Sequence, residues 1–230
     1  MRYPGGKGRC YQHLISLMPP HRTYIETHLG GGAVLRHKRP AERSYGIDKD
    51  VRVIEKWRSI TLPGTTVLQG DAIELLAALQ PGSDDLVYCD PPYPKETRRR
   101  AKLYRHDYDV EEHGRLLDTL RRLPCKVMVS SYDNDLYVRL LSDWRLVRFP
   151  GDSHVGPRVE SVWLNFPEPR TLHDYTYCGG DFRGRERQRR RKNGLMRRIE
   201  ALTELERGAL FRDLAARFGS EIRDAIGPSA

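Results

Sequence analysis

Short apolar runs alternate with amphipathic stretches between Thr23 and Phe166. Seven runs rich in apolar and β-branched residues predict strands, at residues 23–26, 44–48, 66–70, 86–90, 126–130, 144–149 and 159–166. Apolar residues recur at three- and four-residue spacing in the stretches between them, which predicts helices at 50–57, 72–79 and 110–120. This alternation indicates an α/β fold in which helices cover both faces of a mostly parallel sheet.

The last two predicted strands are connected differently from the others. Only residues 151–158 separate them, which is too few for a crossover helix. We therefore expect an antiparallel hairpin at the edge of a seven-stranded, mostly parallel sheet.

The pattern changes after Phe166. Prolines and glycines punctuate a polar segment, and apolar residues at helical spacing then run from Leu202 to Phe218, with Gly219 as the expected helix end. We predict a globular catalytic domain over residues 1–168, a linker over 169–182 and a basic, partly helical extension over 183–230.

Positive charge is concentrated in that extension. The chain has a net charge of +9, and nine Lys or Arg residues stand against one Glu between Arg183 and Arg198. The rest of the chain is close to neutral. The basic run suits sequence-independent binding of phosphates, or it is a disordered, solvated tail.

Several classes of protein are excluded by what the sequence lacks. No apolar run approaches the roughly 20 residues of a membrane span or forms a signal-peptide core, so we expect a cytoplasmic protein without a membrane partner. We also expect a monomer. The four cysteines form no Cys-x-x-Cys pair and no zinc-type cluster, which predicts reduced thiols and no metal. Gly5-Gly6-Lys7 lacks the first glycine, the preceding strand and the trailing Ser or Thr of a phosphate loop, so an ATP-binding loop is excluded.

The sharpest local motif is Asp90-Pro91-Pro92-Tyr93, directly after an apolar strand. Ligands of open α/β sheets bind at this end of the strands. A carboxylate and a main-chain carbonyl, here those of Asp90 and Pro91, can accept both hydrogens of an exocyclic amino group and make its nitrogen more nucleophilic. Tyr93 offers a flat surface for a base turned out of a duplex. The alternative is an ordinary strand-to-loop turn.

A second motif, Glu26 to Gly32, follows the first strand and ends in three glycines. Glycines at Gly30 and Gly32 allow a tight turn close to a ligand, and an acid at Asp48, at the end of the next strand, can accept hydrogen bonds from a ribose. Together they indicate an adenosine-containing cofactor. Asp71, after the third strand, can meet the adenine of that cofactor or cap the following helix.

In their joint order these motifs resemble the Dam-like family of DNA adenine-N6 methyltransferases, whose opening aromatic-x-Gly-Gly-Lys segment is matched by Tyr3 to Lys7. The resemblance covers about residues 1–166 and implies a Rossmann-like S-adenosylmethionine-dependent methyltransferase fold. It implies S-adenosylmethionine as cofactor, S-adenosylhomocysteine as product and no metal. The cofactor-binding residues that it implies are Tyr3, Lys7, Glu26, Gly30, Gly32, Asp48, Asp71 and Asp90. The segments Val129–Tyr132 and Glu160–Phe166 correspond to elements that shape the target-base pocket.

The chain departs from the family pattern in two places. Thr27-His28 stand where the family usually has Pro-Phe, and only 18 residues separate Asp71 from Asp90, so the recognition domain of sequence-specific members is missing. Basic residues after the Asp90 motif are candidates for holding phosphates beside an extruded base. They are Lys95, Arg98, Arg99, Arg100, Lys102 and Arg105.

We therefore predict methyl transfer from S-adenosylmethionine to N6 of an adenine flipped out of duplex DNA, with site-specific or relaxed specificity. The catalytic residues are Asp90, Pro91, Pro92 and Tyr93. One alternative is an RNA adenine-N6 methyltransferase, because the same motif serves RNA substrates. Another is a catalytically inactive DNA-binding relative, which Thr27-His28 and the basic extension would suit.

Overall fold

The computed structural model describes residues 7–8, 10–93, 107–153, 156–179 and 181–226. The chain divides into two compact units, one formed by Met1–Leu14 and His21–Glu168 and the other by Ile15–Pro20 and Pro169–Ala230. Each unit is described by itself below. In the described residues, no helix is both long and apolar enough to span a membrane.

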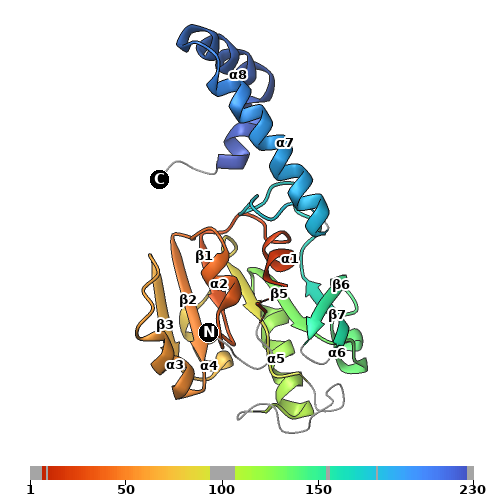
Figure 1. Cartoon of the computed structure of the whole chain (residues 1–230). Coiled ribbons are helices and arrows are strands. Elements are labelled where there is room, and N and C mark those ends of the chain that lie inside the picture. The colour runs from red at the N-terminus through yellow and green to blue at the C-terminus, as the bar shows by residue number, and fades with distance from the viewer. Residues whose placement is uncertain (1–6, 9, 94–106, 154–155, 180, 227–230) are drawn as a thin grey trace. The chain divides into compact units, whose positions relative to one another are not determined.

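The first unit is built on a seven-stranded sheet in the order β3-β2-β1-β4-β5-β7-β6. The strands are β1 (Thr23–Glu26), β2 (Arg43–Asp48), β3 (Thr65–Gln69), β4 (Leu86–Cys89), β5 (Lys126–Ser131), β6 (Arg145–Ser153) and β7 (Gly156–Leu164). The strands β1 to β5 are parallel, and β7 is antiparallel to both β5 and β6 (Figure 1). This topology confirms the predicted Rossmann-like fold with its antiparallel edge hairpin.

The hairpin is tighter than the sequence predicted. β6 extends to Ser153 and β7 begins at Gly156, so both strands run into the segment expected to connect them. Residues of this segment pair across the hairpin, as Gly151 does with Arg158. The added pairing supplies partners for backbone groups that a loop would have left to solvent.

Six of the helices contribute to the first unit: α1 (Tyr11–Ile15), α2 (Ala33–His37), α3 (Val51–Trp57), α4 (Ala72–Leu79), α5 (Val110–Arg122) and α6 (Asp135–Leu140). The positions predicted for α3, α4 and α5 are confirmed to within two residues. Helix α5 begins with a capping box between Asp109 and Glu112, which satisfies backbone amides at its N-terminus.

The main hydrophobic core lies between α4, α5 and α6 and one face of the sheet. Side chains alternate along each strand, so Val87 and Cys89 of β4 enter this core while Leu86 and Tyr88 point to the opposite face. All four are fully buried. Burial on both faces explains why the central strands appear in the sequence as continuous apolar runs.

The second unit contains α7 (Phe182–Glu200) and α8 (Glu204–Ile226). The arginine run is a regular helix of 19 residues, capped at its N-terminus by the Asp181 side chain, and the disordered alternative is not supported. Helix α8 does not end at Gly219 as predicted. Its backbone kinks at Phe218 and the helix continues to Ile226, because a glycine inside a helix lowers its stability without forcing it to end.

Candidate active site

The strand order places two of the predicted motifs next to each other. The chain runs from β1 outward to β2 and β3, then returns to β4 on the other side of β1, so the order reverses between β1 and β4. The motif that begins at Glu26 follows β1, the one that begins at Asp90 follows β4, and the Thr27 amide donates to the Tyr88 carbonyl at 3.0 Å. Ligands of open α/β sheets bind at such a switch point, at the carboxyl ends of the strands.

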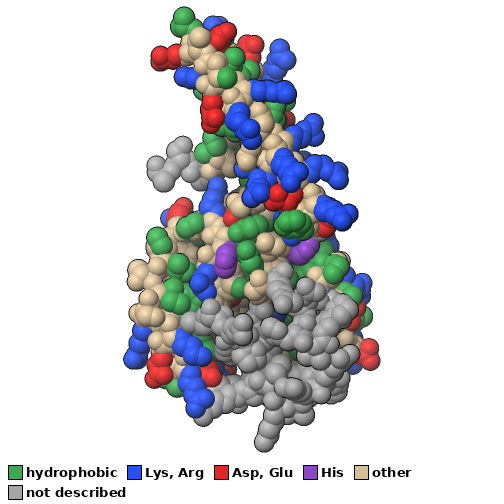
Figure 2. Space-filling model, in the orientation of Figure 1, with side chains coloured by type: hydrophobic (Ala, Val, Ile, Leu, Met, Phe, Trp, Pro, Cys, Tyr) green, Lys and Arg blue, Asp and Glu red, His purple; other side chains and the backbone are tan. Residues whose placement is uncertain are grey.

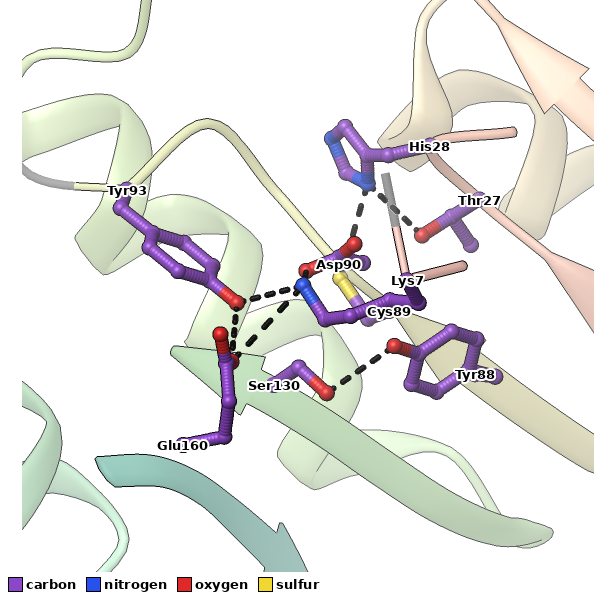
Figure 3. Close-up of polar contacts among 9 residues, drawn as sticks. All are labelled: Lys7, Thr27, His28, Tyr88, Cys89, Asp90, Tyr93, Ser130 and Glu160. Atoms are coloured by element: carbon purple, nitrogen blue, oxygen red, sulfur yellow. Dashed lines mark hydrogen bonds and ion pairs between the residues drawn. The ribbon is translucent and has the colours of Figure 1, made fainter. Parts of the chain in front are cut away.

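Asp90 lies at the carboxyl ends of the parallel strands, beside the ammonium group of Lys7 (Figure 3). Lys7 Nζ donates to Asp90 Oδ1 at 2.6 Å and to the Tyr93 hydroxyl at 2.5 Å, and it lies 3.9 Å from Glu160 Oε2. The Tyr93 hydroxyl donates to Glu160 Oε2 at 2.8 Å. One cation thus joins a carboxylate that follows β4 to one on β7, the two strands that flank β5, in a charge-assisted network.

Burial shapes the acidity of this network. Side chains of Lys7 and Asp90 are 6% and 15% exposed. Burial raises the pKa of Asp90 to about 6, although the Lys7 ammonium opposes the shift. Burial alone would lower the pKa of Lys7, but the negative charges of Asp90 and Glu160 outweigh it, and that pKa lies above its usual value. At neutral pH we therefore expect an ionised pair.

Tyr93 is packed rather than open in this structure. Its side chain is 5% exposed, and its ring meets Tyr132 edge-on with centroids 4.5 Å apart. Lys7 Nζ also lies 4.7 Å from the centre of the Tyr93 ring. Stacking of a base on Tyr93 therefore requires the ring to be uncovered, and this role stays a prediction.

The glycine turn after β1 has the backbone geometry that the sequence suggested. Gly30 and Gly32 have φ values of 46° and 56°, a region that residues with a Cβ seldom adopt. A Cβ at Gly32 would also lie 2.1 Å from the Trp57 ring. Trp57 itself donates to the Gly30 carbonyl at 3.0 Å, a contact that the sequence reasoning missed.

Three predicted cofactor residues accept hydrogen bonds from backbone amides. Asp48, at the end of β2, accepts hydrogen bonds from the backbone amides of Gly30 and Asp50, each at 2.9 Å. Glu26 accepts from the Tyr24 hydroxyl and the Leu35 amide, each at 3.0 Å, and burial raises its pKa to about 8.

The third residue, Asp71, caps α4 by accepting from the Ile73 amide at 2.9 Å. It also accepts from Lys49 Nζ at 3.5 Å. The capping role is thus observed, while a contact of Asp71 with a cofactor stays a prediction. So do the cofactor contacts predicted for Glu26, Asp48 and Lys7.

His28 belongs to a small polar cluster that sequence reasoning did not anticipate. His28 Nδ1 lies 2.9 Å from Thr27 Oγ1 and 3.7 Å from Cys89 Sγ, and Nε2 lies 3.2 Å from the Tyr108 hydroxyl. Burial lowers the pKa of His28 to about 3, so the imidazole is neutral at physiological pH. The sequence pointed to this site through Thr27-His28, which stand where the family usually has Pro-Phe. In the structure both residues belong to the cluster.

Some predicted residues lie outside the described part of the chain. They are Tyr3 and the phosphate-contact candidates Lys95, Arg98, Arg99, Arg100, Lys102 and Arg105. Among the described residues, no group of three or more His, Cys, Asp or Glu side chains could hold a metal ion.

Comparisons with solved structures find distant similarities. A precorrin-6y C5,15-methyltransferase from Geobacter metallireducens has a TM-score of 0.44 and 11% identity, over 67% of this chain and 84% of that one. An rRNA methylase from Streptococcus thermophilus has a TM-score of 0.42 and 10% identity, over 67% and 92%. A magnesium protoporphyrin IX methyltransferase from Synechocystis PCC 6803 with bound S-adenosylmethionine has a TM-score of 0.43 and 14% identity, over 67% and 73%. These similarities are too distant to bear on substrate.

The comparison with family models is more specific. No curated protein sequence matches the chain. Residues 52–150, a segment that includes Asp90 to Tyr93, match one family model. That model is the D12 class N6 adenine-specific DNA methyltransferase, so the match confirms the resemblance over this segment.

Proposed function

We propose that the protein transfers a methyl group from S-adenosylmethionine to N6 of adenine in DNA. The observation that carries the proposal is the position of Asp90. It directly follows β4 at the switch point of the sheet, inside the segment that matches the adenine-methyltransferase family, and its carboxylate lies 2.6 Å from a nitrogen that bears hydrogens, Lys7 Nζ.

The residues present fit the proposed cofactor. A turn with two left-handed glycines follows β1, and Asp48 at the end of the adjacent β2 has its carboxylate oriented by that turn. Acids placed in this way accept hydrogen bonds from the ribose of adenosine-containing cofactors. When bound, S-adenosylmethionine supplies a methyl group on a good leaving group, so the protein contributes mainly orientation and electrostatics.

The proposed chemistry follows from hydrogen bonding at Asp90. The amino nitrogen of adenine is a poor nucleophile because its lone pair is delocalised into the ring. Asp90 and the Pro91 carbonyl accept the two amino hydrogens and return electron density to the nitrogen. With S-adenosylmethionine bound, this nitrogen would accept its methyl group with S-adenosylhomocysteine as the leaving group, and the Asp90 carboxylate would take the proton that N6 loses. A pKa of about 6 makes Asp90 a better acceptor than an exposed aspartate.

In the proposed complex Lys7 shares Asp90 with the substrate. Its ammonium group keeps two other partners, the Tyr93 hydroxyl at 2.5 Å and Glu160 at 3.9 Å. The lysine can therefore release one oxygen of Asp90 without leaving its site. The target adenine must be turned out of the duplex to reach this carboxylate, as in other enzymes that act on a base.

The test is a matched pair of variants in a methyl-transfer assay. Asp90→Asn keeps the side-chain volume and removes the charge, and Asp143→Asn makes the same change at an exposed aspartate that pairs with Arg121 on the surface. Transfer of tritiated methyl from S-adenosylmethionine is measured on duplex DNA, single-stranded DNA and RNA, followed by analysis of the modified nucleoside. Binding of duplex DNA is measured by fluorescence anisotropy.

We expect the unmodified protein to form N6-methyladenine in duplex DNA. Asp90→Asn should lower the rate by about 100-fold or more and leave DNA affinity within about two-fold, because the lost contact is made to the reacting group. Asp143→Asn should change neither. Retained activity in Asp90→Asn would overturn the assignment of Asp90. A strong preference for RNA, or N4-methylcytosine as product, would overturn the proposed substrate.

A further inference from the structure

Helix α7 carries a row of arginines along one side. A residue on an α-helix is rotated by about 100° from the one before it, so positions separated by three, four, seven or eleven residues share a face. Six arginines obey this spacing and fall within an arc of about 120°. This arginine face comprises Arg183, Arg187, Arg190, Arg191, Arg197 and Arg198, with Gly194 between its two halves.

The arginine face is exposed and carries little compensating charge. All six side chains are exposed, and in the described part of the chain none of them forms an ion pair. Arg189, which points elsewhere on the helix, does pair with Glu186 at 3.0 Å. Figure 2 shows Lys and Arg side chains gathered along α7.

The helix keeps this face at a cost to its own stability. Like charges three or four residues apart, such as those of Arg187 and Arg191, destabilise a helix, and Gly184 and Gly194 lower its intrinsic propensity further. A polyanion bound along the face would remove the repulsion. Helix α8 offers a contrast within the same unit, because its five acidic and four basic residues nearly balance.

The spacing of the charges is of the same order as that of phosphates along DNA. With a rise of about 1.5 Å per residue, Arg183 and Arg198 lie about 22 Å apart along the axis, so successive charges are on average about 4.5 Å apart. One strand of B-DNA carries a phosphate per about 3.4 Å. Arginine is also the side chain best suited to bind phosphate oxygens in a bidentate manner.

We propose that the arginine face of α7 binds the phosphate backbone of duplex DNA without reading its sequence. The choice of DNA rests on the proposed function. Phosphate contacts supply affinity and little sequence information. Such an anchor would provide the hold on DNA that the short connection between Asp71 and Asp90 leaves no room for.

The experiment compares two triple variants of the full chain that remove the same charge. Arg183→Gln, Arg190→Gln and Arg197→Gln neutralise half of the arginine face, and Arg212→Gln, Arg217→Gln and Arg223→Gln neutralise three exposed arginines of α8. Affinity for duplexes of about 25 base pairs with unrelated sequences is measured by anisotropy from 50 to 200 mM KCl, without cofactor. Circular dichroism checks the helix content of each variant.

We expect the α7 variant to reduce the slope of log K against log[KCl] by about 2 to 3, since each lost phosphate contact contributes about 0.9. Its affinity at 100 mM KCl should fall at least ten-fold for every sequence, while the α8 variant stays within about two-fold of the unmodified protein. A third variant, with lysine at the three α7 positions, should retain the slope if charge and not folding is responsible.

Two results would overturn the inference: equal effects of the α7 and α8 variants, or tighter α7-dependent binding of duplex RNA than of duplex DNA. The outcome is separable from that of the proposed function. DNA binding through α7 in a protein that transfers no methyl group would support the inference alone, and methyl transfer with an unchanged salt slope in the α7 variant would contradict it alone.

Discussion

At the carboxyl ends of the parallel strands, which we call the sheet edge below, Lys7 and Asp90 are 6% and 15% exposed, and their charged atoms lie 2.6 Å apart. On α7, six arginines are exposed and, within the described residues, unpaired. In the first region each charge has specific partners, and burial protects their interaction from screening by solvent. In the second region like charges recur along an exposed helix, and dissolved salt screens their interactions. Single substitutions should therefore have large effects at the sheet edge and small, additive ones on α7.

Replacing the buried lysine should produce the largest change. Lys7→Met leaves Asp90 and Glu160 without their shared cation, and breaking a buried pair in this way costs about 3 kcal/mol or more. The pKa of Asp90 then rises above about 6, so less of the carboxylate is ionised at pH 7. We expect the acid limb of the pH–rate profile to move to higher pH and activity at pH 7 to fall by at least ten-fold.

The matched control for this variant is Lys56→Met, at an exposed position of α3. Thermal unfolding should show a decrease of about 6 to 12 °C for Lys7→Met and less than about 2 °C for the control. Equal shifts in the two variants would show that the buried network contributes no more than an exposed lysine, and would remove the basis of the comparison.

A second buried carboxylate should make stability depend on pH. The pKa of Glu26 is about 8 in the folded protein and near 4.5 in the unfolded chain. Since the folded state favours the protonated form, the stabilisation from this group is complete below pH 4.5 and is lost as the pH rises through 8. Glu26→Gln, which stays neutral, should match the unmodified protein at pH 5 and unfold several degrees higher at pH 9.

Exposed Glu55 of α3 supplies the control for that experiment. Glu55→Gln should leave the difference in unfolding temperature between pH 5 and pH 9 as it is in the unmodified protein. Should Glu26→Gln behave in the same way, Glu26 would be ionised in the folded state and its burial would have been offset by its hydrogen bonds.

A smaller effect is expected at His28, although its position would suggest otherwise. A pH–rate profile with an apparent pKa near 6 is usually assigned to histidine. Here burial lowers the pKa of His28 to about 3 and raises that of Asp90 to about 6, so the acid limb belongs to Asp90. His28→Asn should retain the limb near pH 6 in kcat/KM. Disappearance of the limb in this variant would reassign it to the histidine.

Local sequence patterns predicted most of the fold. The strands were found because each is a run of apolar or β-branched residues bounded by turn residues, and α4 because its apolar spacing extends over eight residues. Helices α1 and α6, of five and six residues, were missed because they are too short to show a period. The continuation of α8 past Gly219 was missed because a glycine signals a helix end without enforcing it.

The site was predictable only as separate motifs. Asp90 and the glycine turn were identified from their own residues, but their proximity depends on the pairing of β1 with β4, which lie about 60 residues apart. The contact of Lys7 with Asp90 spans 83 positions, and the cluster around His28 joins three separate segments of the chain. Contacts of this kind are determined by the packed fold rather than by local pattern.

The smallest predicted effects concern single arginines of α7. Arg183, Arg190 and Arg197 are seven residues apart and so lie about 10 Å from one another along the helix, far enough for independent contributions. Each single change to Gln should reduce the salt slope by about 0.9 and weaken DNA binding by about two- to four-fold, and the three should sum to the triple variant. In the network of Lys7 and Asp90, by contrast, the loss of stability in the double variant Lys7→Met with Asp90→Asn should be smaller than the sum of the losses in the two single variants. The double variant leaves one buried carboxylate without its cation, whereas Lys7→Met alone leaves two. Strong non-additivity among the arginines, measured in the same anisotropy assay, would mean that they bind phosphate together as one pocket. The arginines of α7 would then not contribute independently, and the contrast with the buried network of Lys7 and Asp90 would be lost.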